Sequence, residues 1–170
     1  MKIWMMTGCS SGLGKQLMPV ALDVTSPQMI EAAVQRIGTH FNTIEGLINN
    51  AGYGYRAAIE EGEDAAIDTL FQTNFFRPLR HIRQVLPIMR KQKSGVIINI
   101  SSAAAVNTFP DFGYYGASKC ALEGASSALA KECAPLGIRV LVVEQSEAQL
   151  HEEMARWLKK SRATAFSSEE

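Results

Sequence analysis

The stretch "TGCSSGLG", residues 7–14, decides how the rest of the sequence is interpreted. It follows a short apolar run, Ile3–Met6, and its glycines at 8, 12 and 14 allow a tight turn and a close backbone approach to a pyrophosphate at a helix N-terminus. An ordinary tight turn after a strand would also explain the glycines. We therefore predict a strand that ends in a phosphate-binding loop, and the remaining sequence has to support it.

The composition favours one soluble domain over residues 1–170. The chain is 46% hydrophobic, and its 17 basic and 17 acidic residues give zero net charge. It shows neither the basic excess nor the basic stripe of nucleic-acid and membrane-surface binders, no membrane-spanning apolar run and no secretory start. Because the three cysteines and three histidines lack metal-ligand or redox spacing, we predict free thiols in a reducing cytoplasm and no metal site.

Short apolar runs alternate with longer segments of helical period, which predicts β-α-β units and a doubly wound parallel sheet. Helices are expected over 27–41, from about 64 to 91 with kinks or breaks at Pro78 and Pro87, over 114–134, and in an amphipathic tail. The expected strands are Ile3–Met6, Pro19–Asp23, "GLIN" from 46, "GVIINIS" from 95 and "IRVLVVE" from 138.

Tyr115 and Lys119, in "YYGASK", lie four residues apart on an expected helix, and so on one face within reach of each other. A tyrosine hydroxyl ordinarily ionises near pH 10, and an adjacent ammonium favours the phenolate, which makes Tyr115 a candidate general acid/base. Tyr114 lies about 100° around the helix and is a poorer partner for the lysine. Taken alone, this spacing is a common accident on helix surfaces.

The stretch "INISS" ends a strand in paired hydroxyls, Ser101 and Ser102. Successive side chains of a strand point to opposite faces, so at most one of the two is expected to face a substrate carbonyl. Serines at strand ends usually cap or turn the chain, which is the alternative explanation.

Together these motifs resemble the short-chain dehydrogenase/reductase family. The resemblance runs from Ile3 to about Glu144 in the family's order: "TGCSSGLG", "LDVTSP", "NNAG", "TN" at 73–74, "ISS", "YGASK" and "IRVLVVE". The loop and "NNAGYG" are most similar to the branch of hydroxysteroid and retinol dehydrogenases. The resemblance implies a Rossmann-type fold in three α/β/α layers, a homodimer or homotetramer, and hydride transfer between NADP (favoured) or NAD and a carbonyl or secondary alcohol.

The resemblance also implies roles for individual residues. Tyr115 would be the acid/base, and Lys119 would promote its ionisation and bind the nicotinamide ribose. Ser102, thirteen residues before Tyr115, would polarise the substrate carbonyl, and Asn74 would hold a water in the proton relay. Asp23 would bind the adenine. The implied cofactor-binding set is Gly8, Ser10, Ser11, Gly12, Leu13, Gly14, Asp23, Val24, Asn50, Ala51, Gly52, Tyr115 and Lys119.

Two other functions are compatible with parts of the sequence. The runner-up is a catalytically silent, cofactor-binding regulatory or scaffold protein, against which the presence of the full set Asn74, Ser102, Tyr115 and Lys119 argues. A sugar-nucleotide epimerase is third, but its loop T-G-x-x-G-x-x-G does not fit Gly12 and Gly14. The apolar stretch "AAAVNTFPDFGY" before Tyr115 suggests a lipophilic small-molecule substrate, and neither a nucleic acid nor a membrane is expected as a partner.

The sequence departs from the family at two places. Lys15–Leu17 span at most about 10 Å, whereas a crossover to the next parallel strand takes about a dozen residues. We therefore expect an omitted strand and helix near 16–18, where the family distinguishes NAD from NADP. A second omission is expected near 144–148, where the family has a Pro-Gly turn and a substrate lid.

Either the molecule contains these segments and the sequence as read omits them, or the gene product is truncated and would fold poorly. We favour the first, because a sheet would not tolerate a gap of roughly two strand spacings, about 10 Å. The intact mass by mass spectrometry is then expected at roughly 25–30 kDa, the size of a complete domain of this class. A measured mass of 18.6 kDa would contradict this expectation.

Overall fold

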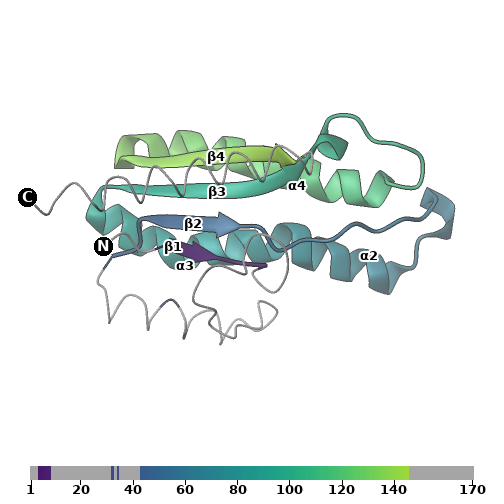
Figure 1. Ribbon diagram of the computed structural model, residues 1–170, viewed down its shortest axis with the longest axis horizontal. Coiled ribbons are helices and arrows are strands. Elements are labelled where there is room, and N and C mark those ends of the chain that lie inside the picture. Colours follow the sequence, from purple (N-terminus) through teal and green to yellow (C-terminus); the bar gives the residue numbers. More distant parts are fainter. Residues whose placement is uncertain (1–3, 9–31, 33, 35–42, 146–170) are drawn as a thin grey trace, which may run out of the picture.

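A computed structural model describes residues 4–8, 32, 34 and 43–145 of the chain. The described strands form a parallel sheet in the order β1-β2-β3-β4. Their carboxyl ends therefore lie at one edge of the sheet (Figure 1), and the predicted α/β fold with a parallel sheet is confirmed. The strands are β1 (Trp4–Met6), β2 (Gly46–Asn49), β3 (Gly95–Ser102) and β4 (Ile138–Gln145).

Among the described residues, the α-helices that accompany these strands are α2 (Asp64–Phe71), α3 (Arg77–Gln92) and α4 (Gly113–Cys133). The helix expected over 64–91 is interrupted, but at neither proline. A π-helical segment, Gln72–Phe76, separates α2 from α3. Pro78 lies two residues after this segment, in the first turn of α3, and α3 continues through the exposed Pro87. The strand expected at Pro19–Asp23 and the tail helix lie outside the described residues.

The apolar core lies between the sheet and the helices. On α3 the buried side chains of Ile82, Val85 and Met89 recur at helical spacing and face the strands. Each large apolar side chain buried in this way stabilises the fold by about 1.5–3 kcal/mol. The buried core cluster comprises Met5, Val34, Ile44, Leu47, Ile82, Val85, Met89, Ile97, Cys133 and Ile138.

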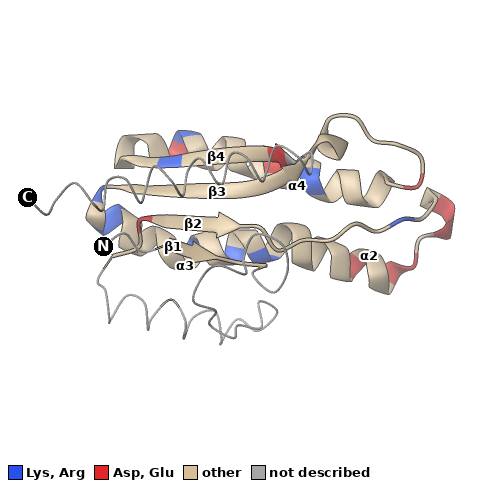
Figure 2. Ribbon diagram, viewed as in Figure 1, with Lys and Arg blue, Asp and Glu red and all other residues tan. Residues whose placement is uncertain are grey.

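Although the chain has zero net charge, its basic and acidic side chains gather in different parts of the surface (Figure 2). Contrary to the sequence expectation, a basic stripe does exist. Helix α3 carries arginine and lysine but no acidic residue, and Arg80, Arg83, Arg90 and Lys91 are exposed. The total charge cancels, although the run over 77–93 has no acidic residue, because acidic residues gather elsewhere, at the end of the molecule where α2 begins: Glu60, Glu61, Glu63, Asp64 and Asp68.

A directed chain of hydrogen bonds joins α3 to α4 across the sheet. Asn49 and Asn99 are register partners on β2 and β3, and the Asn49 Nδ2 donates to Asn99 Oδ1 over 2.8 Å. The Asn99 Nδ2 donates to Ser126 Oγ on α4 over 2.8 Å. On the other side His81 Nδ1 lies 3.0 Å from Asn49 Oδ1, which can only accept, so His81 donates from Nδ1. Its buried Nε2 has no partner among the described residues.

This placement makes the stability of the fold depend on pH. Burial, with a smaller contribution from the Arg77 charge, lowers the pKa of His81 from 6.5 to about 4. Between about pH 6.5 and pH 4 the unfolded chain therefore binds more protons than the folded one, and stability is lost as the pH falls through this range. Between about pH 7 and about pH 4.5 the free energy of unfolding should fall about 2 kcal/mol further for the parent than for His81→Gln, measured with urea. Equal losses would contradict the assignment.

Candidate active site

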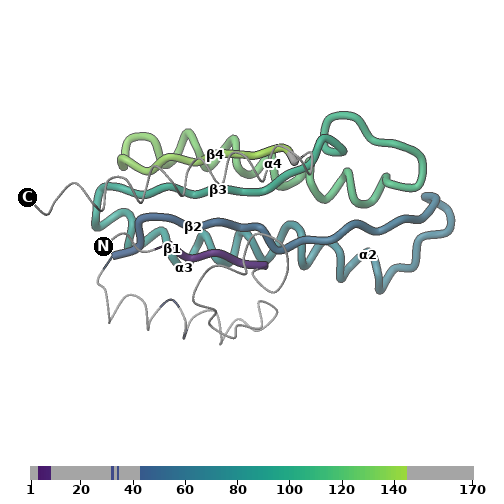
Figure 3. The backbone as a smooth tube through the Cα atoms, viewed as in Figure 1, coloured from purple at the N-terminus to yellow at the C-terminus, as the bar shows by residue number. Residues whose placement is uncertain are grey.

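The loops that follow β2 and β3 run side by side past the carboxyl ends of the strands (Figure 3). The backbone N–H of Ala57 donates to Asp111 O over 2.9 Å, and Arg56 lies 3.9 Å from the Asp111 carboxylate. The hydroxyl of Tyr114 donates to Ile59 O over 2.5 Å. These bonds hold the two loops together where an open parallel sheet binds its ligands.

The ends of β1 and β2 are held together by one buried hydroxyl. Thr7 is 3% exposed, and its Oγ1 accepts hydrogen bonds from the backbone N–H groups of Asn50 and Ala51, each over 3.2 Å. Gly8 has a φ of +73°, and a Cβ there would lie 2.8 Å from Asn50 Nδ2. Only glycine fits this position without strain. Ser10, Ser11, Gly12, Leu13, Gly14, Asp23 and Val24 lie outside the described residues.

Asn74 lies in the π-helical segment and is 1% exposed. Its side chain holds the backbone of Tyr53 on both sides, accepting from Tyr53 N over 3.1 Å and donating to Tyr53 O over 3.0 Å. It also donates to Ser118 Oγ on α4 over 3.1 Å. A Cβ on Gly52 would lie 3.1 Å from Asn74 Oδ1 and 3.3 Å from Lys119 Nζ. The segment after β2 is thus held directly against two predicted catalytic residues.

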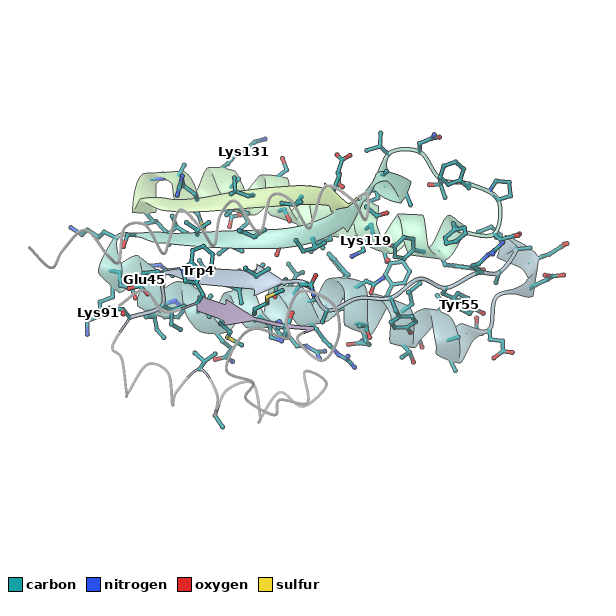
Figure 4. All side chains as sticks on the ribbon, in the orientation of Figure 1. Trp4, Glu45, Tyr55, Lys91, Lys119 and Lys131 are labelled. Atoms are coloured by element: carbon teal, nitrogen blue, oxygen red, sulfur yellow. The ribbon has the colours of Figure 1, made fainter. Side chains whose placement is uncertain are left out.

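Lys119 is a buried ammonium beside the end of β3 (Figure 4). Its Nζ donates to Ile100 O over 2.8 Å and lies 5.9 Å from the centroid of the Tyr115 ring. Burial lowers the pKa of Lys119 from 10.5 to about 8. The half-buried Tyr115 packs edge-on against Phe112, with ring centroids 6.2 Å apart. The structure therefore brings Tyr115 and Lys119 together on one face of α4, as their spacing predicts.

Ser101 and Ser102 make different contacts. The side chain of Ser101 is 1% exposed, and its hydroxyl donates to a carboxylate oxygen of Glu123 on α4. Ser102 is half-buried, and its Oγ accepts from the backbone N–H of Ala104 over 3.3 Å. Ser101 is thus occupied inside the protein, while Ser102 lies at the edge of the sheet where the candidate site is.

Sequence reasoning missed three of these residues. For Thr7, the only signal in the sequence was its position as the first residue of the "TG" that opens the loop. Ser118 and Glu123 hold Asn74 and Ser101, and neither contact can be read from spacing along the chain. In the part of the chain that the structure describes, no three His, Cys, Asp or Glu side chains are placed to hold a metal ion, and no helix there is long and apolar enough to cross a membrane.

The fold and this edge define an α/β protein of the dinucleotide-binding class. The chain belongs to the short-chain dehydrogenase/reductase family, since a sequence model described as "short chain dehydrogenase" matches residues 5–149. The 3-ketodihydrosphingosine reductase of Bacteroides thetaiotaomicron is 41% identical over 138 residues, covering 81% of this chain and 51% of the relative. Oxidoreductase calM of Penicillium decumbens is 30% identical over 182 residues, covering 84% and 60%.

The chain spans about half the length of the first relatives it matches. The alignment with the Penicillium protein is 182 residues long against the 170 of this chain, so that relative has residues without a counterpart here. The relatives do not single out the hydroxysteroid and retinol dehydrogenase branch, which stays a prediction.

Solved structures show the same family. A short-chain dehydrogenase from Streptomyces avermitilis has a TM-score of 0.80 and 32% identity, covering 84% of this chain and 65% of that one. An NAD+-bound xylitol dehydrogenase has a TM-score of 0.70 and 29% identity, covering 74% and 48%. A metagenomic short-chain oxidoreductase in complex with NADP has a TM-score of 0.70 and 31% identity, covering 75% and 58%.

The contact between Ser118 and Asn74 generates a prediction about stability. Ser118 is fully buried, so Ser118→Ala would leave an N–H of Asn74 buried without this acceptor. We expect the variant to lose about 1–2 kcal/mol of unfolding free energy, measured with urea. Ser127→Ala, at an exposed position of the same helix, is the matched control and should change stability by less than about 0.5 kcal/mol. The assignment is wrong if both variants behave alike.

Proposed function

We propose that the protein transfers hydride between a nicotinamide cofactor and a carbonyl or secondary alcohol carbon of a small molecule, with Tyr115 as general acid/base. The observation that carries the proposal is the buried ammonium of Lys119 beside the Tyr115 ring, at the edge where β3 ends in Ser102. A Cβ on Gly52 would meet both Asn74 Oδ1 and Lys119 Nζ, which supports the proposal that Asn74, Ser102, Tyr115 and Lys119 act in one site.

The protein groups have distinct tasks in this reaction. The Lys119 ammonium is held by Ile100 O, with its Nζ 5.9 Å from the centroid of the Tyr115 ring. In reduction, the Tyr115 hydroxyl would give its proton to the substrate oxygen, and in oxidation the phenolate would take that proton back. The Ser102 hydroxyl would donate a hydrogen bond to the same oxygen. With a pKa of about 8, Lys119 remains mostly charged at neutral pH.

Two observations fit a nicotinamide cofactor, which would supply or accept the hydride. The left-handed backbone at Gly8 opens the phosphate loop, and the space of a Cβ there is filled by the turn after β2. Of the three N–H donors of Lys119, the described structure uses one, on Ile100 O, so a ribose hydroxyl could be bound as well. We propose that Gly8, Asn50, Ala51 and Gly52 line the cofactor site, together with Ser10–Gly14, Asp23 and Val24.

For the cofactor we propose NADP, or else NAD. One solved neighbour is NAD+-bound and another is in complex with NADP, and the similarity of the loop residues to the hydroxysteroid and retinol dehydrogenase branch favours NADP. Val106 is 74% exposed and Phe109 59% exposed in the loop between Ser102 and Tyr115. These apolar side chains, and a relative named for a ketone of a sphingoid lipid, favour a lipophilic ketone or alcohol.

The acid/base role of Tyr115 is tested with Tyr115→Phe and a panel of lipophilic ketones, with both reduced cofactors. Removing the proton donor should lower kcat by about 100-fold or more, while cofactor affinity, measured by fluorescence titration, changes little. Tyr114→Phe is the comparison variant: it loses a hydroxyl that bonds Ile59 O, and not a proposed proton donor, so kcat should fall far less than in Tyr115→Phe. Equal turnover of Tyr115→Phe and the parent would refute the role, and cofactor binding without any turnover by the parent would favour the scaffold function.

A further inference from the structure

The last three residues of β3 are held in the sheet from one side only. The ladder between β2 and β3 ends at the pair Asn49 and Asn99, because β2 stops there. The ladder with β4 continues to Ser102. From Ile100 onward, β3 therefore lacks a neighbouring strand on the β2 side, and this is the stretch that places Ser102 in the candidate site.

Side chains of α4 bond three consecutive residues at this point. The three contacts come from three different turns of α4 and reach three consecutive residues of β3. Together they set the position of the helix along the strand. We call them the strand-end contacts. The pairs are Asn99 with Ser126, Ile100 with Lys119, and Ser101 with Glu123.

We propose that Glu123 is a positioning residue, which holds Ser101 so that the adjacent Ser102 points to the substrate oxygen delivered opposite Tyr115. This inference rests on the proposed function for its catalytic consequence. Ser101 is buried and covalently next to Ser102, and the two side chains leave the strand on opposite sides. Fixing Ser101 against α4 therefore fixes the direction of Ser102, in the segment of β3 that does not pair with β2.

The contact between Glu123 and Ser101 also links the two elements that carry Tyr115 and Ser102, which are α4 and β3. Glu123 lies one helical turn after Lys119 and two turns after Tyr115, on the same face of α4. A shift of α4 along β3 would move Tyr115 relative to Ser102. Misplacement of reacting groups by about 1 Å can cost about 100-fold in rate, so a bond at this position has a direct effect on turnover.

The role of Glu123 is geometric and does not depend on its charge. The lowered pKa of Lys119 has burial as its cause. The Ser101 hydroxyl is the donor, so an amide oxygen can accept in place of the carboxylate oxygen. Glu123→Gln should therefore preserve the contact, whereas Glu123→Leu removes the acceptor at nearly constant volume.

The first test measures turnover of Glu123→Leu and Glu123→Gln, normalised to the cofactor-binding fraction. We expect kcat to fall about 10- to 100-fold in Glu123→Leu, with the KM for the cofactor within about threefold, and to be restored in Glu123→Gln with an unchanged pH profile. Glu132→Leu, exposed on the same helix, is the matched control. A normal kcat in Glu123→Leu, or a shifted pH profile in Glu123→Gln, would overturn the geometric role.

The second test needs no turnover and separates this inference from the proposed function. The N–H of Ala104 donates to Ser102 Oγ, so its amide exchange reports the direction of that hydroxyl. Exchange at Ala104, followed by NMR, should accelerate about fivefold or more in Ser101→Ala and Glu123→Leu, and stay at the parent rate in Glu123→Gln. Ser101→Ala removes only a hydroxyl and serves if Glu123→Leu does not fold. Unchanged exchange in Ser101→Ala would overturn the inference even in an active enzyme.

Discussion

The burial of one ammonium group, that of Lys119, is the constraint around which the described part of the molecule is organised. Removing a charge from water is costly unless fixed polar groups replace the lost hydration. Here the replacement is a strand carbonyl, that of Ile100, one residue past the point where β2 stops pairing with β3. The carbonyl is free to accept because the sheet is uneven at this edge. The buried ammonium of Lys119 and the strand carbonyl of Ile100, which has no partner from β2, thus satisfy each other.

The same logic explains why the neighbouring polar residues lie in the interior. Asn74 uses its amide to hold the segment after β2, and that segment passes close to Lys119, since a Cβ at position 52 would lie 3.3 Å from the lysine Nζ. Ser118 then ties Asn74 back to α4. Each of these groups would destabilise the core if it were unpaired, but together they are satisfied. The π-helical segment is the local backbone adjustment that carries Asn74 in this network, and such segments are frequent at functional sites.

The sequence predicted those features that depend on spacing within one element. Helical periodicity places Tyr115 over Lys119, strand alternation separates Ser101 from Ser102, and β-branched runs give the strands. It did not predict contacts between elements, because these depend on the register of strands and helices far apart in the chain. Glu123 meets Ser101 across 22 residues, and His81 meets Asn49 across 32. The interruption at 72–76 was missed for a related reason, since proline is the visible helix breaker and neither proline acts as one.

The residues proposed to carry the chemistry and those expected to select the cofactor lie in different parts of the chain. The contacts described here involve β1 to β4 and α2 to α4, and they close a polar network and an apolar core among themselves. The omission expected near 16–18 falls between β1 and β2 along the chain, whereas the strand-end contacts and the Asn74 bonds join β3, α4 and the segment after β2. If cofactor choice depends on the segment near 16–18, the chemistry and the selectivity can vary independently, as sites built on separate loops of one scaffold allow.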